Sequence, residues 1–87
     1  MWKVGDRVQI VRCLSGKRNL GIKGTVKAKS PYRITVEFDK EMGGHNDCGK
    51  GKVGCCWYFW EYSDNSEYAD QKGITIRKTT SKKNNYW

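Results

Sequence analysis

The clearest strand signal in the sequence is Tyr32-Arg33-Ile34-Thr35-Val36-Glu37-Phe38. Apolar side chains alternate with polar ones along it, so Tyr32, Ile34, Val36 and Phe38 share one face and Arg33, Thr35 and Glu37 share the other. A period of two residues is typical of a strand that buries one face in an antiparallel sheet. The stretch therefore predicts a half-buried strand in an antiparallel β protein.

Residues 24–29 predict the strand before it, with Val26 and Ala28 facing inward. Ser30-Pro31 marks a tight reversal, because proline fixes its own φ and pushes the preceding residue out of the helical region. The two strands should form a hairpin. Three basic side chains are expected to project outward from it as one patch: Lys27, Lys29 and Arg33.

Three further stretches complete the predicted sheet. Residues 7–11 and 73–77 are rich in β-branched side chains, and residues 53–60 are densely apolar and aromatic. We expect Ile74 and Ile76 to face inward. Few helical signals and no internal repeat appear, so the sequence predicts an all-β fold, a small SH3-like antiparallel barrel of about five strands.

The connections carry their own signals. Residues 14–22 look like an exposed loop, and residues 39–52 form a long polar, glycine-rich connection of the kind that is usually functional or mobile. Residues 61–72 are polar, with at most one helical turn near 63–67. We expect one domain over residues 1–78 and a flexible basic tail at 79–87, which has too few apolar side chains to offset its ordering entropy.

The composition is strongly basic. Seventeen Lys and Arg stand against nine Asp and Glu in 87 residues, a formal net charge of +8. Such an excess favours a polyanionic partner, either nucleic acid or an acidic protein surface, although a solvated basic surface without a ligand has the same composition. No apolar run is long enough for a membrane helix, and the first residues lack a secretory signal, so we expect a cytoplasmic protein with no membrane partner.

The first half resembles the KOW motif and its SH3-like relatives. Val4-Gly5-Asp6 opens a strand, and Gly21-Ile22-Lys23-Gly24-Thr25-Val26 matches the Gly-x-x-Gly-x-Val step into the second strand. The resemblance covers about residues 4–38. KOW domains occur in ribosomal proteins and transcription elongation factors, where they contact RNA or protein. The resemblance therefore implies an SH3-like barrel with a binding role.

The second half is similar to a segment of small uncharacterised bacterial and phage proteins. The similarity lies in Gly43-Gly44-His45, Cys48 and Gly54-Cys55-Cys56-Trp57-Tyr58. This similarity does not indicate any particular activity. It implies a phage or prophage source, where small basic proteins often modulate a host complex, and for a phage-encoded chain the host cytoplasm.

His45, Cys48 and Cys55 are candidate zinc ligands, because imidazole and thiolates suit that ion. Their spacing matches known zinc signatures only in part, and Cys55 and Cys56 should point to opposite faces of a strand. Buried thiols are the other interpretation, and the sequence leaves both open. Nothing specifies an activated Cys–His pair, so we expect neither an enzyme nor another cofactor.

The aromatic run Trp57-Tyr58-Phe59-Trp60 provides a second kind of contact group. Alternation sends Trp57 and Phe59 to one face and Tyr58 and Trp60 to the other, so one pair should be core and the other partly exposed. Exposed rings stack on bases or grip a peptide, while a purely structural role stays open for each ring.

These features predict a small binding module associated with nucleic acid or a nucleoprotein complex. Basic side chains would meet phosphates and exposed aromatics would stack on bases. The alternative is a protein-interaction module, such as a phage-encoded modulator or inhibitor of a host protein. The predicted contact residues are Lys17, Arg18, Lys23, Lys27, Lys29, Arg33, Tyr58 and Trp60.

Overall fold

A computed structural model describes residues 2–14, 17–44, 49, 51–52, 54–71 and 73–79. The described residues form seven strands and one short 3-10 helix. The elements are β1 (Arg7–Cys13), η1 (Lys17–Asn19), β2 (Lys23–Lys29), β3 (Ile34–Phe38), β4 (Cys56–Phe59), β5 (Glu61–Tyr62), β6 (Tyr68–Gln71) and β7 (Ile74–Lys78). Every strand pair is antiparallel, in the order β4-β3-β2-β1-β7-β6-β5. The all-β prediction is confirmed.

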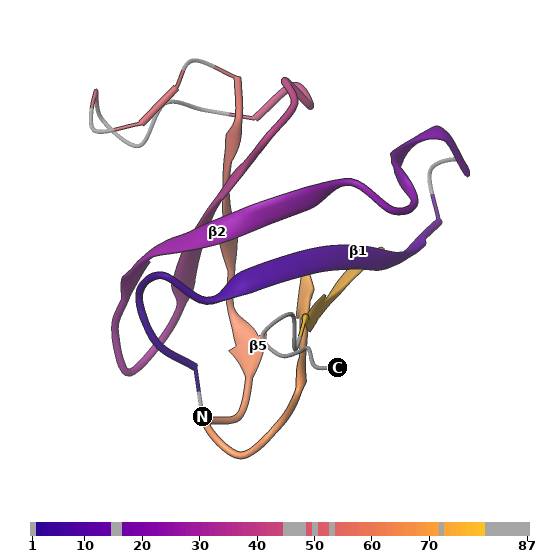
Figure 1. Cartoon of the computed structure of the whole chain (residues 1–87). Helices are drawn as coiled ribbons and strands as arrows, with labels where there is room; N and C mark the ends of the chain where they lie inside the picture. The colour runs from indigo at the N-terminus through magenta and orange to yellow at the C-terminus, as the bar shows by residue number, and fades with distance from the viewer. Residues whose placement is uncertain are drawn as a thin grey trace, which may run out of the picture.

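One bent strand nearly closes this sheet into a barrel. β4 and β5 lie at opposite edges of the sheet, yet only Trp60 separates them in the chain. The first pairs with β3 and the second with β6, so the chain passes from one edge to the other at Trp60. Figure 1 shows β1 and β2 crossing in front of the strand that leads into β5. A narrow seam remains between β4 and β6, whose Cα atoms approach within 8 Å without pairing.

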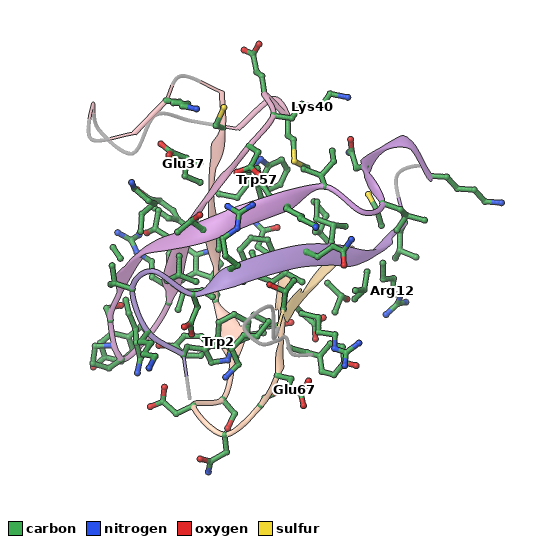
Figure 2. The ribbon with its side chains drawn as sticks, in the orientation of Figure 1. Trp2, Arg12, Glu37, Lys40, Trp57 and Glu67 are labelled. Atoms are coloured by element: carbon green, nitrogen blue, oxygen red, sulfur yellow. The ribbon has the colours of Figure 1, made fainter. Side chains whose placement is uncertain are left out.

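The core fills the space between the crossing strands. Its fully buried members come from nearly every strand: Trp2, Val8, Ile10, Val26, Ile34, Val36, Phe38, Phe59, Ala69, Ile74 and Ile76. Trp2 closes one end of the barrel beside β5, where its ring meets Tyr62 edge-on with centroids 6.3 Å apart (Figure 2). The inward orientation predicted for Ile74 and Ile76 is confirmed.

The predicted count of five strands is wrong. The five predicted stretches correspond to β1, β2, β3, β4 and β7, and the missed elements are the β5–β6 hairpin. Tyr68–Gln71 contains no β-branched residue, so its strand signal is weak. The helical turn expected near 63–67 is instead a hairpin turn, in which the Ser66 amide donates to the Ser63 carbonyl at 2.9 Å.

A β-bulge overturns the predicted orientation at the end of β2. The register shifts between Val26 and Ala28, which places Ala28 opposite Thr35 on the outer face and Lys29 opposite the inward-facing Ile34. Ala28 is consequently exposed rather than buried. A bulge adds one residue to a strand and so reverses the side on which later residues lie.

Two positions of the alternating stretch also differ from the prediction. Tyr32 is 78% exposed, because it lies in the turn before β3 and not in the strand. Thr35 does lie on the outer face, opposite Ala28 and Tyr58, but it is only 3% exposed. We attribute its burial to longer side chains on the flanking strands, which cover its short one.

Other predictions fall partly outside the described residues. Residues 45–48 and 50 of the long connection and residues 80–87 of the predicted tail lie outside them, so the expected mobility of both is untested. Thr79 still follows β7, and its amide donates to the Arg7 carbonyl at 2.9 Å. Among the described residues, no helix has the length and apolar character that a membrane span requires.

Candidate binding surface

Arg33, Tyr58 and Trp60 come together as one cluster, termed here the Arg33 stack. The Arg33 guanidinium carbon lies 3.8 Å from the centroid of the Tyr58 ring and 5.4 Å from that of Trp60. The two rings meet edge-on, with centroids 6.0 Å apart and planes at 83°. A guanidinium stacked on a ring keeps its N–H donors at its rim, where they can meet an anion.

Two local features position the stack. Ser30 holds the turn before β3: its hydroxyl oxygen accepts from the Arg33 amide at 3.2 Å, and its amide donates to the Arg33 carbonyl at 2.8 Å. Tyr58 pairs with Thr35 and so lies on the outer face of β3 and β4. Alternation then returns Trp60 to the same face, at the bend between β4 and β5, where it is 52% exposed.

The predicted hairpin patch of three cations is divided by its ion pairs. Lys29 Nζ lies 2.7 Å from an Asp64 carboxylate oxygen, at the end of the barrel rather than on the outer face. Lys27 Nζ is 3.9 Å from Glu37. The ion pairs among the described residues do not include Arg33. Arg33 is therefore the hairpin cation best placed to meet an outside anion.

A hollow of about 390 Å³ adjoins the stack, termed here the aromatic hollow. Its walls are Gly43, Gly44, Trp57, Tyr58, Trp60 and Gln71, so it lies along the seam between β4 and β6. Gly44 packs closely there, since a Cβ atom at that position would lie 2.6 Å from Trp57 Nε1. Figure 2 shows Trp57 and the outward-facing Glu37 on opposite sides of β4.

A second hollow of about 400 Å³, termed the acidic hollow, is lined by Trp60, Glu61, Asp70 and Gln71. Trp60 and Gln71 line both hollows, which are therefore contiguous. Glu61 and Asp70 face each other across the β5–β6 pair. The surface around Trp60 thus has a cationic aromatic side and an acidic side.

The remaining predicted basic residues lie elsewhere. Lys17 is exposed in η1 and Lys23 is exposed at the start of β2, whereas Arg33 follows the end of β2. The two ends of that strand are roughly 20 Å apart at the usual rise of about 3.3 Å per residue. The Arg18 side chain lies outside the described residues. The structure therefore unites Arg33, Tyr58 and Trp60, with Lys27 nearby, and separates the others.

The predicted zinc ligands are only partly described. His45 and Cys48 lie outside the described residues, and Cys55 is a thiol only 6% exposed. Within the described part of the chain, no three His, Cys, Asp or Glu side chains are grouped to hold a metal ion. The zinc site stays a prediction.

Sequence reasoning missed the residues that complete the surface on the β6 side. Glu61, Asp70 and Gln71 belong to the unrecognised β5–β6 hairpin. The available signal was the polar cluster Ser63-Asp64-Asn65-Ser66, whose residue types favour a tight turn between strands. Read as a hairpin, that cluster would have brought Asp70 opposite Glu61.

No protein-family model, curated protein or solved structure matches this chain. Its function must therefore be argued from the chemistry of its own residues.

Proposed function

We propose that this chain is an SH3-like barrel that binds nucleic acid through the Arg33 stack. The observation that carries the proposal is the stacking of Arg33 on Tyr58, beside the half-exposed ring of Trp60. The resemblance of residues 4–38 to KOW domains supports the same role, because that segment includes the turn that holds Arg33. The protein acts as a binding module rather than an enzyme.

The stack offers both contacts that a nucleic-acid strand needs. The guanidinium presents planar donors that match two phosphate oxygens, and its stacking on Tyr58 fixes its orientation before binding. Trp60 presents a ring on which a base stacks, worth about 1–3 kcal/mol per base. Lys27 adds a nearby charge, since exposed ion pairs such as Lys27–Glu37 contribute little and exchange readily.

The geometry favours single strands over duplex. A ring at the bend of a strand can stack only on a base that is free of its own stack, and single strands supply such bases at little cost. The net charge of +8 draws any strand toward the protein, and binding releases counterions. Affinity should consequently fall as salt rises, although the stacking contribution should persist.

Fluorescence anisotropy of labelled single-stranded and duplex oligonucleotides, at low and near-physiological salt, tests the proposal. Arg33→Ala is expected to weaken single-strand binding about tenfold, as loss of a charged hydrogen-bonding contact does. Lys17→Ala is the control, because it removes one positive charge from an exposed position in η1, at the end of β2 opposite Arg33. Equal effects of the two variants, or no binding at physiological salt, would contradict the proposal.

Docking onto a host protein is the second candidate function. Val11, Leu14 and Leu20 are 41%, 69% and 43% exposed, and all lie near η1, at the end of β2 opposite Arg33. Exposed apolar side chains at one end of a barrel can contribute to a protein-contact site. If a phage-encoded chain modulates a host enzyme through this end, one stoichiometric protein will co-purify with it, and Leu14→Ser will abolish that capture without changing oligonucleotide affinity.

A further inference from the structure

The seam beside Trp60 is too narrow to accept another strand. An added strand would need roughly 10 Å between its two neighbours, whereas Cα atoms of β4 and β6 approach within 8 Å. An extended peptide therefore cannot pair into the gap. A ligand bound in this region would instead lie over the seam, in the hollows that Trp60 and Gln71 share.

The acidic hollow holds two carboxylates in an unfavourable arrangement. Glu61 and Asp70 are direct cross-strand partners on the exposed β5–β6 hairpin, and like charges in that position destabilise a sheet. The ion pairs among the described residues include neither carboxylate, although Arg12 lines an adjoining hollow together with both. One Asp70 oxygen accepts from the Thr75 hydroxyl at 2.7 Å, which leaves its second oxygen for another donor.

We propose that the acidic hollow selects nucleobases that carry an exocyclic amino group, namely cytosine, adenine and guanine, over thymine and uracil. The base stacks on Trp60 and its amino group donates to Glu61 or Asp70. This inference rests on the proposed nucleic-acid function. It adds which edge of the base the acidic hollow beside Trp60 recognises.

The chemistry of the base edges supports the selection. Carboxylates accept hydrogen bonds only, and the amino groups of cytosine, adenine and guanine are donors at the base edge. Thymine and uracil present carbonyl oxygens on both sides of their single ring N–H, and those oxygens are repelled by carboxylates. Gln71 carries both a donor and an acceptor at the same hollow, so it can pair with any base and does not reverse the preference.

The charge distribution also orients the strand. Phosphates are attracted to Arg33 on one side of Trp60 and repelled by Glu61 and Asp70 on the other. A nucleotide stacked on Trp60 therefore places its phosphate toward the Arg33 stack and its base edge toward the acidic hollow. A protein partner would need an anionic group and a cationic group at the same spacing, which a nucleotide provides by its own structure through phosphate and amino group.

The test compares short labelled oligodeoxycytidine and oligodeoxythymidine strands by fluorescence anisotropy, with the full chain at neutral pH and near-physiological salt. We expect oligodeoxycytidine to bind about fivefold more tightly, the lower end for one base contact in an open site. Glu61→Ala should reduce this ratio to about one, and Asp70→Asn should reduce it in part. Glu67→Ala is the matched control: it removes an exposed carboxylate that pairs with Arg77, outside the hollow, and should preserve the ratio.

The outcomes separate the two proposals. If both strands bind equally, or if the ratio survives in Glu61→Ala and Asp70→Asn, base selection is wrong while the nucleic-acid function stands. If neither strand binds the folded protein, both proposals are wrong. Glu61-dependent binding of a lysine-rich peptide, without any base preference, would assign the hollow to a protein partner and overturn base selection. Circular dichroism melting curves establish that each variant is folded.

Discussion

At the scale of single residues, Trp60 lies at a bend of the chain and also keeps half of its ring exposed to solvent. It is the bend that sends the chain from β4 to β5, and it keeps 52% of its surface exposed between two hollows. A buried indole would have satisfied the bend equally well. We propose that the indole, left half exposed at a fixed position, is a contact for a planar ligand.

Replacement of Trp60 by Ala should weaken oligonucleotide binding about tenfold, because one base loses its stacking surface. The matched control is Tyr68→Ala, which removes an aromatic ring of similar exposure, 46%, from β6. That control should change the affinity less than about twofold. Anisotropy titrations of both variants decide the matter, and similar losses in the two would show that exposed rings contribute without regard to position.

The Arg7–Asp39 pair gives the structure a measurable response to acid. Two hydrogen bonds from the Arg7 guanidinium, at 2.7 and 3.1 Å, lower the pKa of Asp39 from its usual value near 3.8, against a smaller opposing effect of burial. The same pair raises the pKa of Arg7. Because the folded pKa of Asp39 lies below the unfolded one, the stabilisation is complete above the unfolded pKa and is lost as pH falls through the folded pKa.

Asp39→Asn should therefore lower the free energy of unfolding by less than about 1 kcal/mol near neutral pH, since the pair is exposed. Below the folded pKa of Asp39 the substitution should leave the free energy of unfolding unchanged. Urea unfolding of both proteins at neutral pH and at about pH 2.5 measures this difference, while the other carboxylates contribute equally to each protein. A difference that stays constant between the two pH values would mean that the ion pair does not stabilise the fold.

At the scale of elements, the strands with strong alternation were predictable and the weakly patterned ones were not. The apolar residues of β3 and β7 lie where their period places them, because burial on one face imposes the register. Tyr68–Gln71 lacks that pattern and becomes a strand only by pairing with β7. Its strand character comes from tertiary contacts, which local sequence does not encode.

The candidate site was predictable where alternation is regular and not where it is broken. Arg33, Tyr58 and Trp60 were identified because simple alternation holds along β4 and from Arg33 into β3. Lys29 was misplaced because the β-bulge in β2 depends on how β3 pairs with it, and a bulge has no clear sequence signature here. Glu61 and Asp70 required knowledge of a hairpin that the composition conceals.

Besides its pairing with β6, β5 makes a contact that helps to close the barrel. The Tyr62 hydroxyl donates to the Ser30 carbonyl in the turn between β2 and β3, so it ties opposite parts of the sheet together. Tyr62→Phe should lower the free energy of unfolding by about 1 kcal/mol, through loss of the hydrogen bond and a partly buried carbonyl left unpaired. That corresponds to a fall of about 4–8 °C in Tm for a domain of this size.

Tyr68→Phe serves as the control for this change. Its hydroxyl makes no hydrogen bond to another described residue, and its ring is half exposed. Calorimetric melting of the two variants should show a loss only for Tyr62→Phe. Equal Tm values would mean that β5 is held by its two-residue pairing with β6 alone.

At the scale of the whole molecule, the barrel depends on a plug at one end. Trp2 is 1% exposed and packs among Tyr62 and the Lys78 side chain, whose ammonium lies 5.0 Å from the indole. Trp2→Ala should destabilise the protein by about 3–5 kcal/mol, a large share of the 5–15 kcal/mol typical of small domains. Urea unfolding measures the loss.

Trp2→Phe should lower the free energy of unfolding by less than half as much, because phenylalanine keeps an aromatic ring at this position. The change also removes the Trp2 Nε1 donor, which is buried without a hydrogen-bond partner among the described residues. If the Ala and Phe variants lose similar stability, the end of the barrel is closed by something other than the volume of this ring.

The two ends of β2 lead to different surfaces. The Arg33 stack lies beyond one end, and the exposed apolar side chains near η1 lie beyond the other. The central claim is that nucleic acid binds at the first of these. Two-dimensional amide NMR of the full chain, titrated with a single-stranded oligonucleotide at near-physiological salt, tests it most directly. The account predicts shifts at β3, β4 and the Trp60 indole, with η1 unchanged; shifts centred on η1, or none at any site, would contradict it.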